Sequence, residues 1–197
     1  MRLIFATNNT HKTDEIRALL PKEFSIVTLK EAGIEGDIPE PHDTLQDNAA
    51  EKARTIYAIT HNNCFSDDTG LEVYALNNEP GVHSARYAGE ERSFEQNIDK
   101  LLQKMENIQD RSARFRAVIC LILNGEEHFF EGICEGSILT ERKGVEGFGY
   151  DPVFMPVGAD KSFAEMSMEE KNTYSHRGKA VAALVAFLKQ LSLKYNN

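Results

Sequence analysis

Long apolar runs and a positive charge balance are both missing from this chain of 197 residues. No stretch approaches the roughly 18 consecutive apolar residues that a membrane span needs. The apolar start, residues 3–6, is also too short for a secretory signal, so we expect a cytoplasmic protein. The formal net charge of −9 leaves no positive face for non-specific binding to nucleic acid. A polyanionic ligand would therefore have to bind a few local cations or a metal ion.

Cysteine is scarce as well. The three cysteines are odd in number, form no C-x-x-C pair and lie in apolar, strand-like stretches, which is typical of buried free thiols. A two-residue hairpin turn at Asn124-Gly125 would set Cys120 opposite Phe129 and Cys134 opposite Phe115. Because the two thiols are not partners in that register, we expect no disulfide.

Two motifs of common enzymes are absent. There is no G-x-x-x-x-G-K run, which excludes a Walker A phosphate loop, and no G-x-S-x-G elbow, which argues against a Ser-His-Asp hydrolase. The chemistry must come from other residues.

The order of the predicted elements indicates an α/β (mixed α+β) fold. Short crossovers mixed with hairpins favour a mixed β-sheet flanked by helices over a doubly wound one. The length and the lack of a linker indicate a single domain over residues 1–197. We expect strands over 2–6, 24–29, 64–67, 71–76, 115–123 and 128–139, and helices over 12–20, 44–60, 94–105 and 178–193.

Two adjacent carboxylates, Asp67 and Asp68, follow a short apolar run. Neighbours in a regular strand point to opposite faces, so the two can share one site only where the strand breaks. We expect Thr69-Gly70 to supply that break. Carboxylates this close need a cation or a shared proton, and Mg²⁺ with oxygen ligands suits them. The alternative is that one Asp caps a turn and the other is solvated.

Three further stretches carry polar or cationic groups. Thr7 to Lys12 joins a strand to a helix start and is typical of an anion site, or of an ordinary N-cap. Gly144 to Phe154 is rich in glycine and aromatic residues, which suits close contact with a base or a structural turn. Lys171 to Lys179 gathers cations at the start of the last helix, and the alternative is a solvated charge run.

These stretches carry four motifs in order: F-A-T-N-N-x-x-K; D-D-T-G-L-E-V with P-G-V-H-S-A-R-Y-A-G; G-F-G-Y-D-P-V-F; and S-H-R-G-K-A. From about Leu3 to Leu188 the chain resembles the inosine/xanthosine triphosphate pyrophosphatases (ITPases). The resemblance implies a two-lobed fold with a central nucleotide cleft, and a homodimer. It also implies hydrolysis of the non-canonical purine nucleotides ITP, dITP and XTP to the monophosphate and pyrophosphate, with Mg²⁺ as cofactor.

The resemblance also implies roles for single residues. Asp68 matches the general base and metal ligand, while Glu40 and Asp67 match the rest of the metal site. Asn8 stands where many members have Gly, and Thr69 stands where most have Ser. The substrate-contacting positions are Thr7, Asn8, Asn9, Thr10, His11, Lys12, Thr69, Phe148, Gly149, Tyr150, Asp151, Lys171, His176 and Arg177.

Base choice has a physical logic. Hypoxanthine and xanthine present an acceptor at O6 and a donor at N1, the reverse of adenine. Backbone N–H groups over residues 148–151, with His176 and Arg177, would donate to O6 and oppose the amino group of adenine. Two other functions stay open: a pyrophosphatase for pyrimidine or modified nucleotides, and a non-catalytic nucleotide sensor. The retained Asp67-Asp68 pair argues against the sensor.

Overall fold

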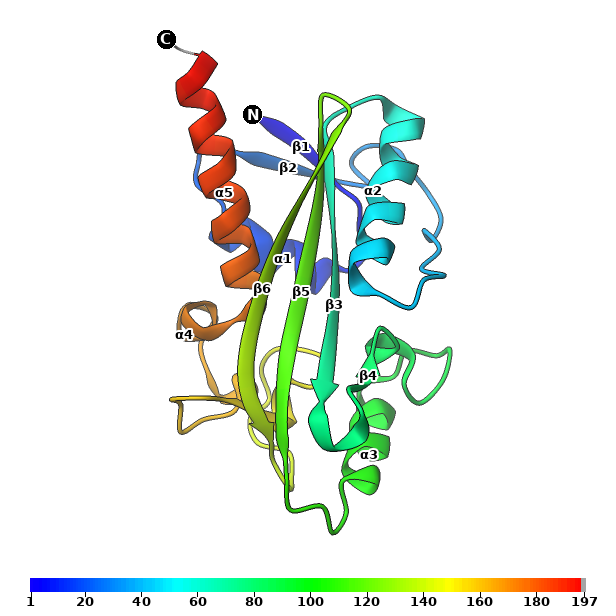
Figure 1. Ribbon diagram of the computed structural model, residues 1–197, viewed down its shortest axis with the longest axis vertical. Coiled ribbons are helices and arrows are strands. Elements are labelled where there is room, and N and C mark those ends of the chain that lie inside the picture. Colours follow the sequence, from blue (N-terminus) through cyan, green and yellow to red (C-terminus); the bar gives the residue numbers. More distant parts are fainter. Residues whose placement is uncertain (196–197) are drawn as a thin grey trace. The chain divides into compact units, whose positions relative to one another are not determined.

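The computed structural model describes residues 1–195, and it confirms the predicted mixed sheet flanked by helices (Figure 1). The chain divides into two compact units. The first holds residues 1–68, 117–132 and the chain from 177 onward, and the second holds 69–116 and 133–176. Strands β3 (Cys64–Val73), β5 (Ser112–Leu123) and β6 (Glu126–Ile138) contribute residues to both. The single domain stays a prediction.

Parallel pairing organises the sheet of the first unit. Strand β1 (Arg2–Phe5) pairs in parallel with β2 (Ser25–Thr28) on one side and with β3 on the other. The strand order is β2-β1-β3-β5-β6. The helices of this unit are α1 (Thr10–Leu19), α2 (Leu45–Thr60) and α5 (His176–Tyr195), whose first residue belongs to the second unit.

The alternation of side chains along β3 decides which helix each residue meets. Phe65 faces a core built from Phe5 of β1, Ile16 of α1 and Leu184 of α5. The residues on either side of Phe65 face α2, because the Cys64 thiol and the Ser66 hydroxyl donate hydrogen bonds to carbonyls of that helix. Helices α1 and α5 therefore cover one face of the first unit's sheet, and α2 covers the other.

The second unit has its own core. Here β4 (Glu79–Gly81) pairs antiparallel with β3, and β7 (Phe154–Pro156) pairs antiparallel with β6. Helices α3 (Phe94–Lys104) and α4 (Met168–Tyr174) complete the unit, with short 3-10 turns at 74–76, 84–86, 151–153 and 163–165. The core packs α3 against β3, β5 and the aromatic residues that follow β6.

The expected break in β3 was wrong. The strand runs without interruption from Cys64 through Thr69-Gly70 to Val73, and residues 74–76 form a 3-10 turn instead of a further strand. Gly70 does not break the strand, as was expected, but allows a neighbouring strand to come close. A Cβ at this position would lie 2.5 Å from the carbonyl oxygen of Gly81, so glycine permits the close approach of β4.

Helix α4 was not predicted, although the sequence holds a signal for it. Ser167 accepts from the N–H of Glu170, whose side chain accepts from the N–H of Ser167 in return. This reciprocal capping box precedes a helix of only 7 residues, too short for an apolar stripe.

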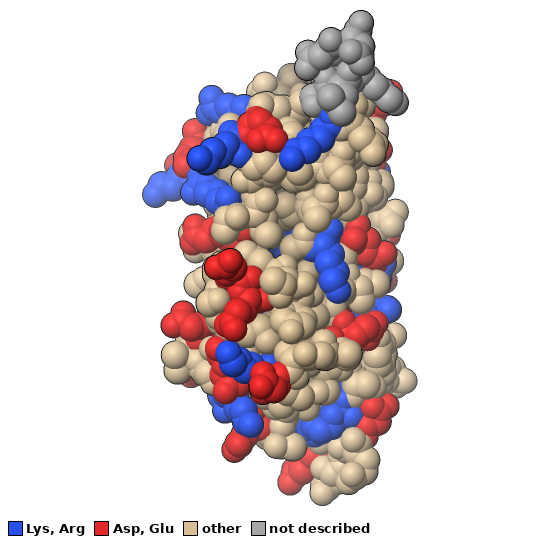
Figure 2. Space-filling view, turned by 90° about the vertical axis from the view of Figure 1, so that its left-hand side faces the viewer, with Lys and Arg blue, Asp and Glu red and all other residues tan. Residues whose placement is uncertain are grey.

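Acidic and basic side chains are interspersed over most of the face drawn in Figure 2, and several lysine or arginine side chains lie together at its upper left. Within residues 1–195, no helix has the length and apolar character required to cross a membrane.

The three thiols are buried and free, as predicted. Burial raises the pKa of Cys64 and of Cys120 to about 12, so neither presents a thiolate at neutral pH. A maleimide or disulfide reagent should therefore modify no cysteine in the folded protein at pH 7.5 and all three in guanidinium chloride. Mass spectrometry would count the adducts, and rapid labelling of the folded chain would contradict the packing around β3 and β5.

Candidate active site

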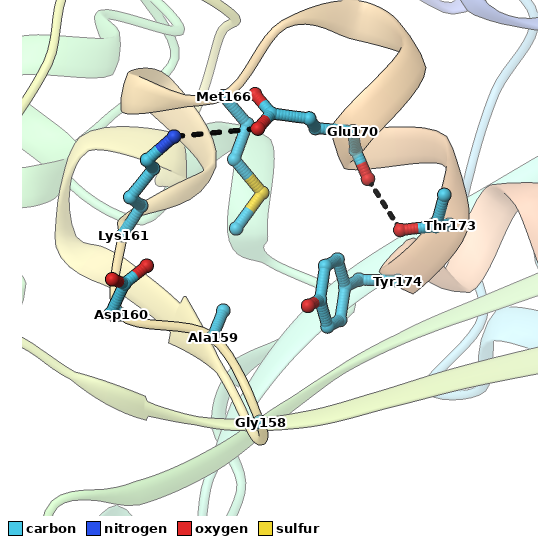
Figure 3. Close-up of a pocket in the computed structure, with 8 residues that line it drawn as sticks. All are labelled: Gly158, Ala159, Asp160, Lys161, Met166, Glu170, Thr173 and Tyr174. Atoms are coloured by element: carbon cyan, nitrogen blue, oxygen red, sulfur yellow. Dashed lines mark hydrogen bonds and ion pairs between the residues drawn. The ribbon is translucent and has the colours of Figure 1, made fainter.

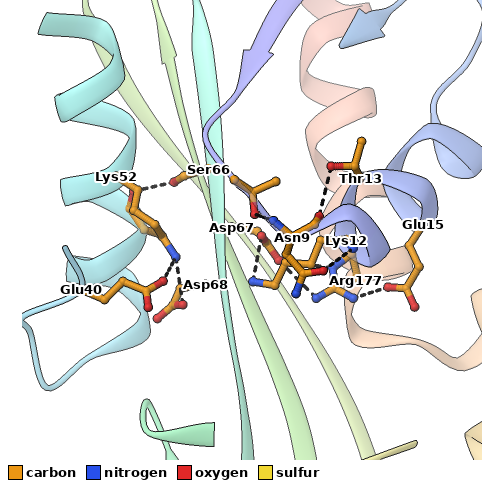
Figure 4. Close-up of polar contacts among 12 residues, drawn as sticks. Asn9, Lys12, Thr13, Glu15, Glu40, Lys52, Ser66, Asp67, Asp68 and Arg177 are labelled. Carbon is orange, nitrogen blue, oxygen red and sulfur yellow. Dashed lines mark hydrogen bonds and ion pairs between the residues drawn. The ribbon is translucent and has the colours of Figure 1, made fainter. Parts of the chain in front are cut away.

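The uninterrupted course of β3 sends Asp67 and Asp68 to opposite faces of the sheet (Figure 4). Asp67 shares the α1 and α5 face with Phe65, and Asp68 shares the α2 face with Ser66. Their carboxylates therefore do not contact the same partners. Adjacent residues that were expected to form one acidic pair instead belong to two ion-pair groups.

Asp67 is clamped between two cations. Its Oδ1 lies 3.0 Å from Lys12 Nζ, and its Oδ2 accepts from Arg177 Nε and Nη2 at 3.3 Å each. Arg177 also pairs with Glu15 of α1, a residue that the sequence analysis did not single out. Burial opposes ionisation of Asp67, yet the positive charges of Lys12 and Arg177 hold its pKa far below the usual value.

Asp68 belongs to a smaller group with Glu40 and Lys52. Lys52 Nζ lies 3.1 Å from Asp68 Oδ1 and 2.5 Å from Glu40 Oε1, so one ammonium bridges the two carboxylates. Burial raises the pKa of Asp68, against the opposing charges of Lys52 and Lys12. The pKa of Asp67 is thus lowered and the pKa of Asp68 is raised. Two carboxyl groups with pKa values displaced in this way can take different roles, one staying ionised and the other accepting a proton.

Lys52 was missed by the sequence analysis, although a signal exists. The predicted apolar stripe of α2 includes Leu45, Ala49, Ala53 and Ile56, and Lys52 falls inside that stripe at helical spacing. Lys52 is only 6% exposed. A charged side chain on the buried face of a helix requires a partner, and here Glu40 and Asp68 supply it.

The turn before α1 has the expected character of a helix start. Asn9 is the N-cap, and its side chain accepts from the N–H of Lys12, while Thr10 and His11 open the first turn. The Thr7 hydroxyl accepts from the N–H of Asn9. Asn8 points elsewhere: its Nδ2 donates to the carbonyl of Gly36 at 2.9 Å and to Asp37 at 3.2 Å. Asn8 therefore tethers the loop that precedes Glu40.

In the second unit, Asp151 holds the glycine-rich loop together. Its Oδ2 accepts from the backbone N–H of Phe148 at 2.9 Å and from Lys171 Nζ at 2.6 Å. The same ammonium lies 5.2 Å from the centre of the Phe148 ring. The Asp151 N–H is also used within the loop, bonding the carbonyl of Phe148, which leaves the N–H groups of Gly149 and Tyr150 without a partner in the described part of the chain.

The remaining predicted residues are anchored in different ways. The hydroxyl of Tyr150 donates to the carbonyl of Ser84 at 2.8 Å, which links the last aromatic motif to the P-G-V-H-S-A-R segment. His176 is buried at the start of α5 and stacks on Phe115. Thr69 is half-buried in β3.

A cavity of about 650 Å³ in the second unit involves none of the predicted residues (Figure 3). Its lining includes Met166, Tyr174 and the ion pair between Lys161 and Glu170. Lys171 lies on the same helix, yet its ammonium is directed to Asp151 and does not line the cavity. No residue of the two ion-pair groups or of the glycine-rich loop therefore lines this cavity.

Comparison with known proteins places the chain in a family. The model of the Ham1 family matches residues 3–187. Among curated proteins, the dITP/XTP pyrophosphatase of Porphyromonas gingivalis is 54% identical over 188 residues, which cover 95% of this chain and 97% of that protein. The dITP/XTP pyrophosphatase of Flavobacterium psychrophilum is 48% identical over 189 residues, covering 96% of this chain and 100% of the relative.

Solved structures agree. The Staphylococcus aureus Ham1 protein superimposes with a TM-score of 0.87 at 38% identity, covering 96% of this chain and 99% of that one. A HAM1 protein from Coxiella burnetii gives a TM-score of 0.89 at 36% identity, with the same coverage. The fold and the motifs are those of a Ham1-type enzyme. The chain belongs to the Ham1 family, and the predicted family resemblance is confirmed.

Removing one carboxylate at a time should separate the two ion-pair groups. Asp67→Asn leaves the half-buried Lys12 without another carboxylate in contact among residues 1–195, and because Asp67 lies in the interior we expect the change to cost about 3 kcal/mol of unfolding free energy. Asp68→Asn is the matched control, because Lys52 keeps its ion pair with Glu40, and the loss of unfolding free energy should be about 1 kcal/mol. Urea unfolding followed by circular dichroism measures both, and equal losses would contradict the asymmetry.

The depressed pKa of Asp67 also makes stability depend on pH. Because its folded pKa lies below the unfolded value of about 3.9, the stabilisation is complete above that value and is lost as the pH falls below it. The difference in unfolding free energy between the native chain and Asp67→Asn should therefore shrink from pH 6 to pH 3. A difference that stays constant over this range would show that Asp67 does not stabilise through its charge.

Proposed function

We propose that this chain is a nucleoside triphosphate pyrophosphatase that removes non-canonical purine nucleotides, ITP, dITP and XTP, from the nucleotide pool. The name of its curated relatives, dITP/XTP pyrophosphatase, supports the reaction and the substrate class. The single structural observation that carries the proposal is the group of Asp68, Glu40 and Lys52. It places a buried carboxylate of raised pKa beside a second carboxylate and a cation.

Asp68 is the general base of the proposed reaction. It orients a water for attack on the α-phosphorus and takes its proton, the bond from the α-phosphorus to the α,β-bridging oxygen breaks, and pyrophosphate leaves. A free aspartate with a pKa near 3.9 is a weak base, and burial improves Asp68 as a proton acceptor. Asp67 stays ionised and acts through Lys12, which it holds at 3.0 Å.

Glu40 and Asp68 are the residues proposed to hold Mg²⁺. Mg²⁺ is commonly bound by one or two carboxylates and completed by substrate phosphates and water, and Lys52 already occupies the place between these two carboxylates with a positive charge. In the described part of the chain, no cluster of three His, Cys, Asp or Glu side chains is placed for a metal. When bound, Mg²⁺ would supply neutralisation of phosphate charge and a lower pKa for a bound water. Asp67 as a further ligand stays a prediction.

The triphosphate is proposed to bind the start of α1, which includes Lys12, and Lys52 of α2. The first turn of α1 presents backbone N–H groups and the positive end of the helix dipole, and Lys12 and Lys52 add two ammonium groups. Asn8 contributes indirectly, because it tethers the loop that carries Glu40. The phosphate-binding roles of Thr7, Asn9, Thr10 and His11 remain proposals.

The base is proposed to bind the second unit. The N–H groups of Gly149 and Tyr150 are available to a ligand, whereas those of Phe148 and Asp151 are used within the loop. Together with His176 they would donate to O6 of hypoxanthine or xanthine, and the amino group of adenine would meet donors instead. Lys171 and Asp151 hold the loop in shape.

The decisive measurement is pyrophosphate release from ITP, XTP, ATP, GTP and dTTP, with Mg²⁺ and with excess EDTA, for the native chain and Asp68→Asn. We expect release from ITP and XTP only, its loss in EDTA, and a fall in kcat of about 10²–10⁴-fold in Asp68→Asn. Circular dichroism of the variant excludes unfolding as the cause.

Each other outcome points elsewhere. Orthophosphate instead of pyrophosphate would move the attack to the γ-phosphorus and overturn the mechanism. Preference for dTTP would indicate a pyrophosphatase for pyrimidine nucleotides, and nucleotide binding without turnover would indicate a sensor. The family resemblance also supports a homodimer, which light scattering of the purified protein tests. The short apolar start and the net charge of −9 support the proposed cytoplasmic location and the lack of a nucleic-acid partner.

A further inference from the structure

His176 lies flat against an aromatic ring. The ring centres of His176 and Phe115 are 4.7 Å apart and the planes differ by 13°, so the imidazole and the phenyl ring are stacked. Both side chains are buried, at 3% and 6% exposure. Phe115 comes from β5 and His176 from the first residue of α5, and both belong to the second unit.

Phe115 is itself held in place by two further rings. Phe154 of β7 meets it edge-on with centres 4.6 Å apart, and Phe163 lies parallel to it at 6.1 Å. Phe163 is fully buried and lies inside the capping box formed by Ser162 and Glu165. The rings form a packed wall, so the plane of Phe115 is set by the core and not by solvent.

We propose that Phe115 is a positioning residue for base recognition, which acts by fixing the plane of the His176 imidazole. A ring N–H donates in the plane of its ring, so a fixed plane gives a fixed donor direction. An N–H donor of fixed direction strengthens binding of a purine with an oxygen at position 6 and weakens binding of a purine with an amino group there. This inference rests on the proposed function, because it requires His176 to donate to O6.

A purely structural role makes a different prediction, and Phe154 provides the matched control. Phe154 belongs to the same ring wall and is fully buried, yet its ring contacts are Phe115 and Phe163, and not His176. Phe115→Leu and Phe154→Leu remove the same ring from the same core. Only Phe115→Leu removes the ring against which the His176 imidazole stacks.

The experiment compares kcat and KM for ITP and ATP in the native chain, Phe115→Leu and Phe154→Leu, below the melting temperature of each variant. We expect Phe115→Leu to lower the ITP/ATP ratio of kcat/KM by about tenfold, mainly through a higher KM for ITP. Phe154→Leu should lose comparable stability and keep the native ratio. An equal change in both variants, or none in Phe115→Leu, would overturn the inference.

A double-mutant cycle tests whether the effect passes through His176. If Phe115 acts by orienting the imidazole, then adding Phe115→Leu to His176→Ala should leave the ITP/ATP ratio unchanged from His176→Ala alone. A further fall in the double variant would show that Phe115 acts by another route. Failure of the native chain to hydrolyse ITP would refute the proposed function itself, whereas ITP turnover with an unaltered ratio in His176→Ala would refute only this inference.

Discussion

The alternation of side chains along one uninterrupted strand is the constraint on which the chemistry of this protein depends. Because β3 does not break after its acidic pair, Asp67 and Asp68 are separated by the thickness of the sheet although they are covalent neighbours. Each then takes its environment from a different helix layer. Asp67 is paired with Lys12 and Arg177, whose charges lower its pKa, whereas burial raises the pKa of Asp68.

This separation also explains the charge balance of the first unit. Three cations of the first unit, the half-buried Lys12 and the buried Lys52 and Arg177, are each paired with a carboxylate, so none of the three is an uncompensated charge. Burying an unpaired ammonium would cost several kcal/mol. The paired carboxylates therefore allow these three cations to lie in the first unit of an acidic protein.

Local sequence patterns predicted most of the fold, and they singled out Asp67 and Asp68, which the structure places in two ion-pair groups. Helix α2 was found from Thr44, which caps it as expected, and from its apolar spacing. The predicted break in β3 was wrong because Gly70 makes room for the backbone of β4 and does not end the strand. No local sequence pattern reveals that contact. Glu15 and Lys52 were missed because a charged residue at a buried helical position gains its meaning only from partners distant in sequence. The family motifs indicated the candidate residues, and the geometry of β3 shows which of them lie together.

The buried thiols have a consequence for the conditions under which such an enzyme is needed. Nitrosating agents convert amino groups of purines to oxo groups, and the same agents attack exposed cysteine thiolates. Cys64 of β3 and Cys120 of β5 have pKa values of about 12 and are buried in the core. The chemical stress that generates deaminated nucleotides would therefore meet no thiolate at either of these two cysteines.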